Sequence, residues 1–107
     1  MATTQNLDVS TTQRCELVDI TEKVAAAVRA SGLQDGLCTV FSPHTTAAIT
    51  INENADPDVQ EDLLMALERA VPNRGFKHSE GNSDAHTKTS MVGPSVTVIV
   101  EGGRLKL

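Results

Sequence analysis

A chain of 107 residues with 39% hydrophobic residues is expected to form one small domain that buries roughly 65% of its extended-chain surface. Only 2% of the residues are aromatic, with no Trp and no Tyr, so the core is expected to be thin and to favour self-association. A net charge of −5 without a basic run argues against nucleic-acid binding, and no apolar run approaches the roughly 20 residues that span a bilayer.

The N-terminal segment is rich in Thr and contains neither Pro nor Gly. Leu7 and Val9, followed by further apolar residues before position 21, predict a β-hairpin that turns at residues 10–13. The opening residues lack the basic and apolar parts of a signal peptide. Cys15 and Cys38 have no second ligand at short spacing, so we expect reduced core cysteines in a cytoplasmic protein.

The next predicted elements are a short helix and two strands. The helix begins at Thr21, a favourable N-cap residue, and Gly32 supplies its stop. Residues 37–41 are β-branched and aromatic enough to form a buried strand. Pro43 interrupts this strand, and the apolar alternation of residues 45–51 predicts a second one.

Asp56 and Pro57 predict the start of the longest helix, since an acidic cap precedes proline at the first helical position. Apolar residues then repeat every four positions until Pro72. Residues 73–88 are polar and predict a long loop, with a short helix at residues 85–91.

The C-terminal part predicts a strand at residues 94–101, a tight turn at Gly102 and Gly103, and a final strand. The expected fold class is therefore α+β: a small single domain in which a mixed or antiparallel sheet packs with two main helices.

All three histidines fall in two polar stretches, residues 44–56 and 78–86. Zinc and similar ions take three or four nitrogen, oxygen or sulfur ligands. His44, His78 and His86 could supply such a set if the two stretches meet. The alternative is three partly exposed histidines on polar loops.

Acidic and amide side chains accompany the histidines. Glu53 lies between a predicted strand and a predicted helix, where a carboxylate can act as a general base. Asp56 is interpreted as a structural N-cap. Asn52 and Asn54 could either bind a ligand or brace the turn.

Gly81, Asn82 and Asp84 lie between two of the histidines. Backbone N–H groups and side chains in such an arc can bind an anion such as phosphate. The alternative is an ordinary turn in which Gly81 has positive φ and the polar side chains bond to the chain.

Several of these segments together resemble the YjbQ-like family, described as secondary thiamine-phosphate synthases. The matching segments are residues 42–48, 51–59, 62–63, 78–86 and 93–95. The resemblance implies a small α+β domain that assembles as a homotrimer, with sites where subunits meet. It also implies an enzymatic activity, in which a pyrimidine diphosphate is joined to a thiazole phosphate. Family members usually continue beyond the last strand, so residues 1–107 are expected to lack a C-terminal segment.

The residues and the resemblance together give a predicted site for a small phosphorylated substrate. The predicted metal ligands are His44, His78 and His86, and the predicted catalytic residues are Glu53 and Asp84. The predicted substrate-binding residues are Thr45, Asn54, Gly81 and Asn82. The expected cofactor is a divalent metal ion, zinc first, with magnesium as the alternative for a diphosphate substrate. Two other functions stay open: a non-catalytic metal- or phosphometabolite-binding protein, and a metal-dependent hydrolase.

Overall fold

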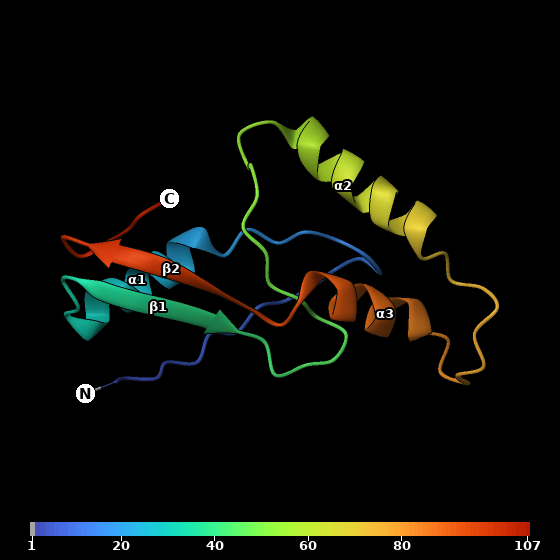
Figure 1. The fold of residues 1–107 in the computed structure, drawn as a ribbon, viewed down its shortest axis with the longest axis horizontal. Helices are drawn as coiled ribbons and strands as arrows, with labels where there is room; N and C mark the ends of the chain where they lie inside the picture. The colour runs from blue at the N-terminus through green and yellow to red at the C-terminus, as the bar shows by residue number, and fades with distance from the viewer. Residues whose placement is uncertain (1) are drawn as a thin grey trace. The chain divides into compact units, whose positions relative to one another are not determined.

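The computed structural model describes residues 2–107, which form three helices and one three-stranded sheet. The helices are α1 (Thr21–Ser31), α2 (Pro57–Ala70) and α3 (Ser83–Val92), and the strands are β1 (Gly36–Phe41), β2 (Ser95–Glu101) and β3 (Arg104–Leu105). The strand order is β1-β2-β3, with antiparallel neighbours, so the predicted α+β class is confirmed (Figure 1). No helix within residues 2–107 is long and apolar enough to cross a membrane.

The chain divides into two compact units, one formed by residues 2–39 with Thr97–Leu107 and the other by Val40–Val96. We call the first the α1 unit and the second the α2–α3 unit. The predicted organisation as a single domain stays a prediction.

In the α1 unit, helix α1 is capped by a residue that precedes the predicted start. The N-cap is Ile20, not Thr21, and makes no side-chain cap, while Asp19 Oδ1 accepts a hydrogen bond from the Thr21 backbone N–H at 2.9 Å. Gly32 ends the helix with φ of 75°, as predicted. Val24 and Val28 are buried on one side of α1.

The C-terminal hairpin of the α1 unit follows the sequence prediction. Strand β2 alternates so that Val98 and Val100 are buried. Gly102 and Gly103, with φ of 60° and 78°, form the turn, and Val100 then pairs with Leu105 in β3. Positive φ at both turn residues suits a two-residue hairpin and favours glycine.

The predicted N-terminal hairpin is wrong, because residues 2–20 form neither a strand nor a helix. Side-chain bonds hold the segment instead: Gln5 Nε2 donates to Ala27 O at 2.9 Å, and Lys23 Nζ donates to Asp8 O at 2.7 Å. A two-stranded hairpin is marginal unless it buries a face, and almost all of this segment is exposed. Cys15 and Cys38 form no disulfide, and Cys15 is exposed, so it is not a core residue.

In the α2–α3 unit, helix α2 begins and ends close to the predicted positions. Asp56 Oδ1 accepts a hydrogen bond from the Asp58 backbone N–H at 2.9 Å, and Pro57 occupies the first helical turn. The structural interpretation of Asp56 is therefore confirmed. Helix α2 has no fully buried side chain. Most of the apolar residues along one side of the helix are half-buried.

The other elements of this unit differ from the prediction. Residues 45–51 form no strand, because only isolated backbone bonds reach this region, such as Ile49 N to Gly93 O at 3.1 Å. A strand requires a neighbouring strand that bonds to it residue after residue. Gly93 and the residue beside it offer only single bonds. Helix α3 spans ten residues and begins at Ser83, so it is a third full helix and shortens the predicted polar loop.

Candidate functional site

The loop before α3 turns back so that two of the three histidines meet. Residues 79 and 80 form a turn, Gly81 adopts φ of 77°, and the chain then enters α3. The rings of His78 and His86 lie edge to face, with centroids 5.8 Å apart and an interplanar angle of 87°. The structure therefore brings together two histidines from a single polar stretch.

Glu80 lies beside this histidine pair. Its Oε2 is 3.7 Å from His78 Nε2, and the side chains of Glu80 and His78 are 72% and 39% exposed. Solvent screens such a contact, so its contribution to stability is small. The contact places the carboxylate of Glu80 next to the imidazole of His78 at a solvent-accessible position.

Asn82 is the N-cap residue of α3, but its side chain makes no capping bond. Its backbone carbonyl accepts hydrogen bonds from Ala85 N at 3.0 Å and His86 N at 3.2 Å. The side-chain Oδ1 is buried without a hydrogen-bond partner within the described chain. An unsatisfied buried acceptor costs roughly 1–3 kcal/mol, so a ligand that donates a hydrogen bond here would relieve that cost.

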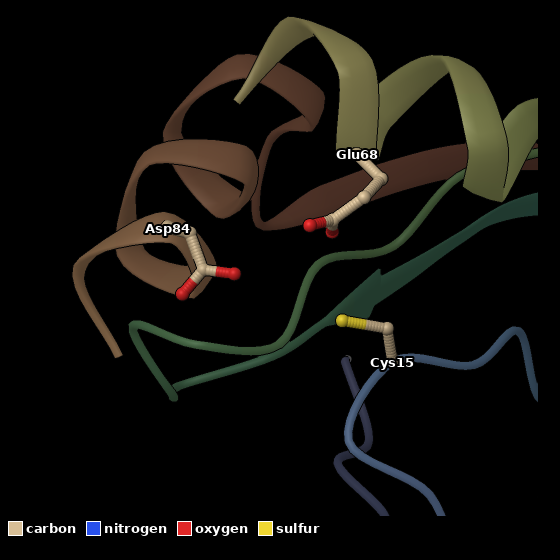
Figure 2. Close-up of side chains that lie close together, drawn as sticks. All are labelled: Cys15, Glu68 and Asp84. Atoms are coloured by element: carbon tan, nitrogen blue, oxygen red, sulfur yellow. The ribbon is translucent and has the colours of Figure 1, made fainter. Parts of the chain in front are cut away.

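Asp84, predicted to be catalytic, is buried in a charged cluster. Its side chain is 0% exposed, and its Oδ2 lies 3.4 Å from Lys88 Nζ. Lys88 Nζ also lies 2.8 Å from Glu68 Oε2. Figure 2 shows the carboxylates of Glu68 on α2 and Asp84 on α3 pointing toward each other; Cys15, drawn in the same view, belongs to the α1 unit.

His44 and Thr45 are exposed and follow β1, and residues 45 and 46 form a turn. The His44 backbone N–H donates to Ser42 Oγ at 3.3 Å, and Ser42 is buried. Among residues 2–107, no histidine belongs to a set of three potential ligand atoms that all lie within 4.8 Å of one another. The described chain therefore forms no three-histidine ligand set by itself, although the rings of His78 and His86 meet.

The acidic segment before α2 is exposed to solvent. The Glu53 backbone N–H donates to Asn52 Oδ1 at 2.7 Å, so Asn52 braces the turn. Asn54 Oδ1 accepts a hydrogen bond from Gln60 Nε2 of α2. Glu53 itself is exposed, so its carboxylate is accessible.

Lys88 and Glu68 were not among the residues predicted from the sequence. The spacing between Asp84 and Lys88 is four residues, which places oppositely charged side chains on one face of a helix and could have indicated their pairing. Glu68 lies on a different helix, and no local signal connects it to Lys88.

A protein-family model described as "UPF0047 protein YjbQ-like" matches residues 5–107. UPF0047 protein MJ1081 of Methanocaldococcus jannaschii is 50% identical over 97 residues, which are 90% of this chain and 70% of that protein. UPF0047 protein YugU of Bacillus subtilis is 48% identical over 105 residues, which are 96% of this chain and 80% of that protein. The similarity thus extends over nearly the whole of this chain.

Solved structures show the same fold. An uncharacterized conserved protein of the yjbq/upf0047 family from Clostridium acetobutylicum has a TM-score of 0.82 and 56% identity, covering 84% of this chain and 70% of that one. A YbjQ-like protein of unknown function from Sulfolobus solfataricus has a TM-score of 0.87 and 35% identity, covering 92% and 73% of the two chains. These four relatives are named without an activity or a bound metal.

Proposed function

The chain belongs to the YjbQ-like UPF0047 family, and on this premise we propose that it is an enzyme acting on a small phosphorylated substrate. The proposed reaction resembles that of a secondary thiamine-phosphate synthase, in which a pyrimidine diphosphate joins a thiazole phosphate and diphosphate leaves. The observation that carries the proposal is the contact between the His78 and His86 rings, which places two imidazoles together at the start of α3.

The proposed reaction needs donors for phosphate oxygens and an acceptor for a proton. Backbone N–H groups at Gly81 and the amide N–H₂ of Asn82 would bind phosphate, as the polar arc before α3 predicts. Thr45 and Asn54 would contact the rest of the substrate. Glu53 is exposed and would accept a proton as a general base, which suits an ionised carboxylate within reach of substrate.

The histidine pair fits part of a metal site. Two imidazoles bound tetrahedrally to one zinc ion would have ring centroids roughly 5 Å apart, given Zn–N bonds of about 2 Å. The separation of 5.8 Å between His78 and His86 is close to this value. Nitrogen ligands favour zinc over magnesium, which prefers oxygen. When bound, a divalent ion would neutralise charge on the leaving diphosphate.

A zinc site requires at least one further protein ligand, and we propose that His44 of a neighbouring copy supplies it in a homotrimer. Within one chain, His44 does not share a three-ligand cluster with the pair. Its exposure makes it accessible to another subunit. A ring of three subunits repeats one interface three times, so each pair would meet one neighbouring His44.

An exposed apolar sheet face supports this assembly. Leu37 of β1 is 68% exposed and Ile99 of β2 is 53% exposed. The hydroxyls of Thr39 and Thr97 lie 3.1 Å apart on the same strands, which places these two uncharged side chains on one face of the sheet. Contiguous apolar residues of this kind often mark protein–protein contacts.

The proposed function is tested by measuring diphosphate release from the pyrimidine diphosphate and thiazole phosphate substrates. We expect Glu53→Gln to reduce turnover by roughly 100-fold or more, the scale on which general bases contribute. Glu61→Gln is the matched control, because Glu61 is another exposed glutamate and lies on α2. It should leave turnover unchanged.

Other outcomes would select the two alternative functions. Substrate binding without turnover, unaffected by Glu53→Gln, would contradict the enzyme and favour a metabolite-binding protein. Hydrolysis of the diphosphate without a coupled product would indicate a hydrolase. Product analysis by mass spectrometry distinguishes coupling from hydrolysis.

A further inference from the structure

Lys88 is a largely enclosed cation between two carboxylates. Its side chain is 13% exposed, and Nζ lies 2.8 Å from Glu68 Oε2 and 3.4 Å from Asp84 Oδ2. Removing an ammonium group from water is costly unless opposite charges accompany it. The burial of Lys88 is therefore coupled to the positions of both carboxylates.

The two carboxylates belong to different helices, Glu68 to α2 and Asp84 to the first turn of α3 (Figure 2). Helix α2 has no fully buried side chain, and Asp84 is the only buried residue of α3. Apolar packing between these helices is therefore limited. The ammonium of Lys88 provides a charged connection between α2 and the beginning of α3.

The beginning of α3 also holds His86. Asp84 and Lys88 are four residues apart and share one face of the helix. His86 follows Asp84 by two residues, which rotates it roughly 200° around the helix axis. The charged contacts and the imidazole therefore lie on opposite faces of the same helical turns, with His86 next to His78.

We infer that Lys88 is a positioning residue: by holding Asp84 and Glu68 together, it fixes the first turns of α3 so that the His86 ring faces His78. This inference rests on the proposed function for its biological consequence, which is the affinity of the histidine pair for a metal ion. It also gives Asp84, predicted as catalytic, a positioning role.

The test compares Lys88→Met, which removes the charge, with Lys88→Arg, which keeps it. Lys106→Met is the control, because Lys106 forms an exposed ion pair with Glu101 in the other unit. Two properties are measured: the nuclear Overhauser contact between the two imidazoles in metal-free protein, and the affinity for cobalt(II) from its absorption spectrum.

We expect Lys88→Met to lose the His78–His86 contact and to bind cobalt(II) about tenfold or more weakly, as removal of groups that orient metal ligands commonly does. Lys88→Arg should retain most of the histidine contact and most of the cobalt(II) affinity. Lys106→Met should change neither property. A folded Lys88→Met protein with the wild-type histidine contact would overturn the inference.

Glu68→Gln decides the question if Lys88→Met does not fold. Glu68 is 53% exposed, so this variant removes the negative charge on α2 that pairs with Lys88 and leaves Asp84 and Lys88 in place. It should weaken the histidine contact, and an unchanged contact would contradict the inference. Absence of cobalt(II) binding by the wild-type protein would refute the metal site, while the nuclear Overhauser measurement would still test the role of Lys88.

Discussion

Gly81 determines the direction of the chain between His78 and α3. Its φ is 77°, and a Cβ atom built on it would have no neighbouring atom within 4 Å. The surrounding atoms therefore leave room for a side chain at position 81. The left-handed backbone conformation is what restricts the choice of residue. Residues with a Cβ atom are strained in this region, although Asn tolerates it better than most.

Replacing Gly81 with Ala should destabilise the protein by about 1 kcal/mol, because alanine is strained at this φ. Gly81→Asn should cost less, since asparagine adopts left-handed backbone more readily. Urea unfolding of the two variants and the wild type measures the difference. Equal stability of Gly81→Ala and the wild type would show that the turn does not depend on glycine.

Val100 is the most deeply buried apolar side chain of the described chain, with 1% exposure. Val100→Ala should reduce stability by about 2 kcal/mol, because it removes two buried methyl groups and leaves a cavity. Val92→Ala is the control, since Val92 is 38% exposed. Thermal unfolding should show a clearly lower Tm only for Val100→Ala, and similar Tm values would be inconsistent with a core at β2.

At the scale of secondary-structure elements, α2 depends on its ends more than on its packing. It has no fully buried residue, and Asp56 provides its N-terminal cap. A lost cap is therefore not offset by a large apolar interface. The stability of α2 can therefore be tested by removing its cap.

Asp56→Ala should destabilise the protein by about 1 kcal/mol through loss of the cap. Asp62→Ala, in the exposed middle of α2, removes the same charge without removing a cap and should have a smaller effect. Denaturant unfolding followed by circular dichroism makes the comparison. An equal or larger loss for Asp62→Ala would mean that charge, not capping, is what matters.

The elements predicted correctly are those whose signals are local. The cap at Asp56 and the two glycines of the β2–β3 turn involve neighbouring residues only, and both were confirmed. The N-terminal hairpin and the strand at residues 45–51 were wrong, because alternation in the sequence does not supply a partner strand. Helix α3 was predicted too short, because its first turn is polar and carries no apolar period.

The same distinction applies to the candidate site. His78 and His86 belong to one polar stretch, and a turn at Gly81 brings their rings together. The connection from Lys88 to Glu68 spans 20 residues and two helices, so only the tertiary structure reveals it. The predicted set of His44, His78 and His86 stays a prediction, with the rings of His78 and His86 in contact, and the sequence did not indicate the contact of Lys88 with Glu68.

At the scale of the whole molecule, the exposed face of the sheet is where we expect subunits to meet. If the proposed trimer forms, Leu37→Lys combined with Ile99→Lys should shift it to monomer, because two buried charges would be unpaired in the interface. Leu17→Lys is the control, since Leu17 is 36% exposed and lies outside the sheet. Light scattering coupled to size-exclusion chromatography measures the mass, and an unchanged trimer in the double variant would place the interface elsewhere.

The metal content of the protein after reconstitution with zinc tests whether a zinc site is shared between subunits. We expect about one ion per chain in the wild type and none in His44→Ala or His78→Ala. When these two variants are unfolded together and reassembled in equal amounts, about a quarter of the sites should recover, because only mixed interfaces contain a complete ligand set. Absence of zinc from the wild type, or absence of recovery in mixed trimers, would contradict a site shared between subunits.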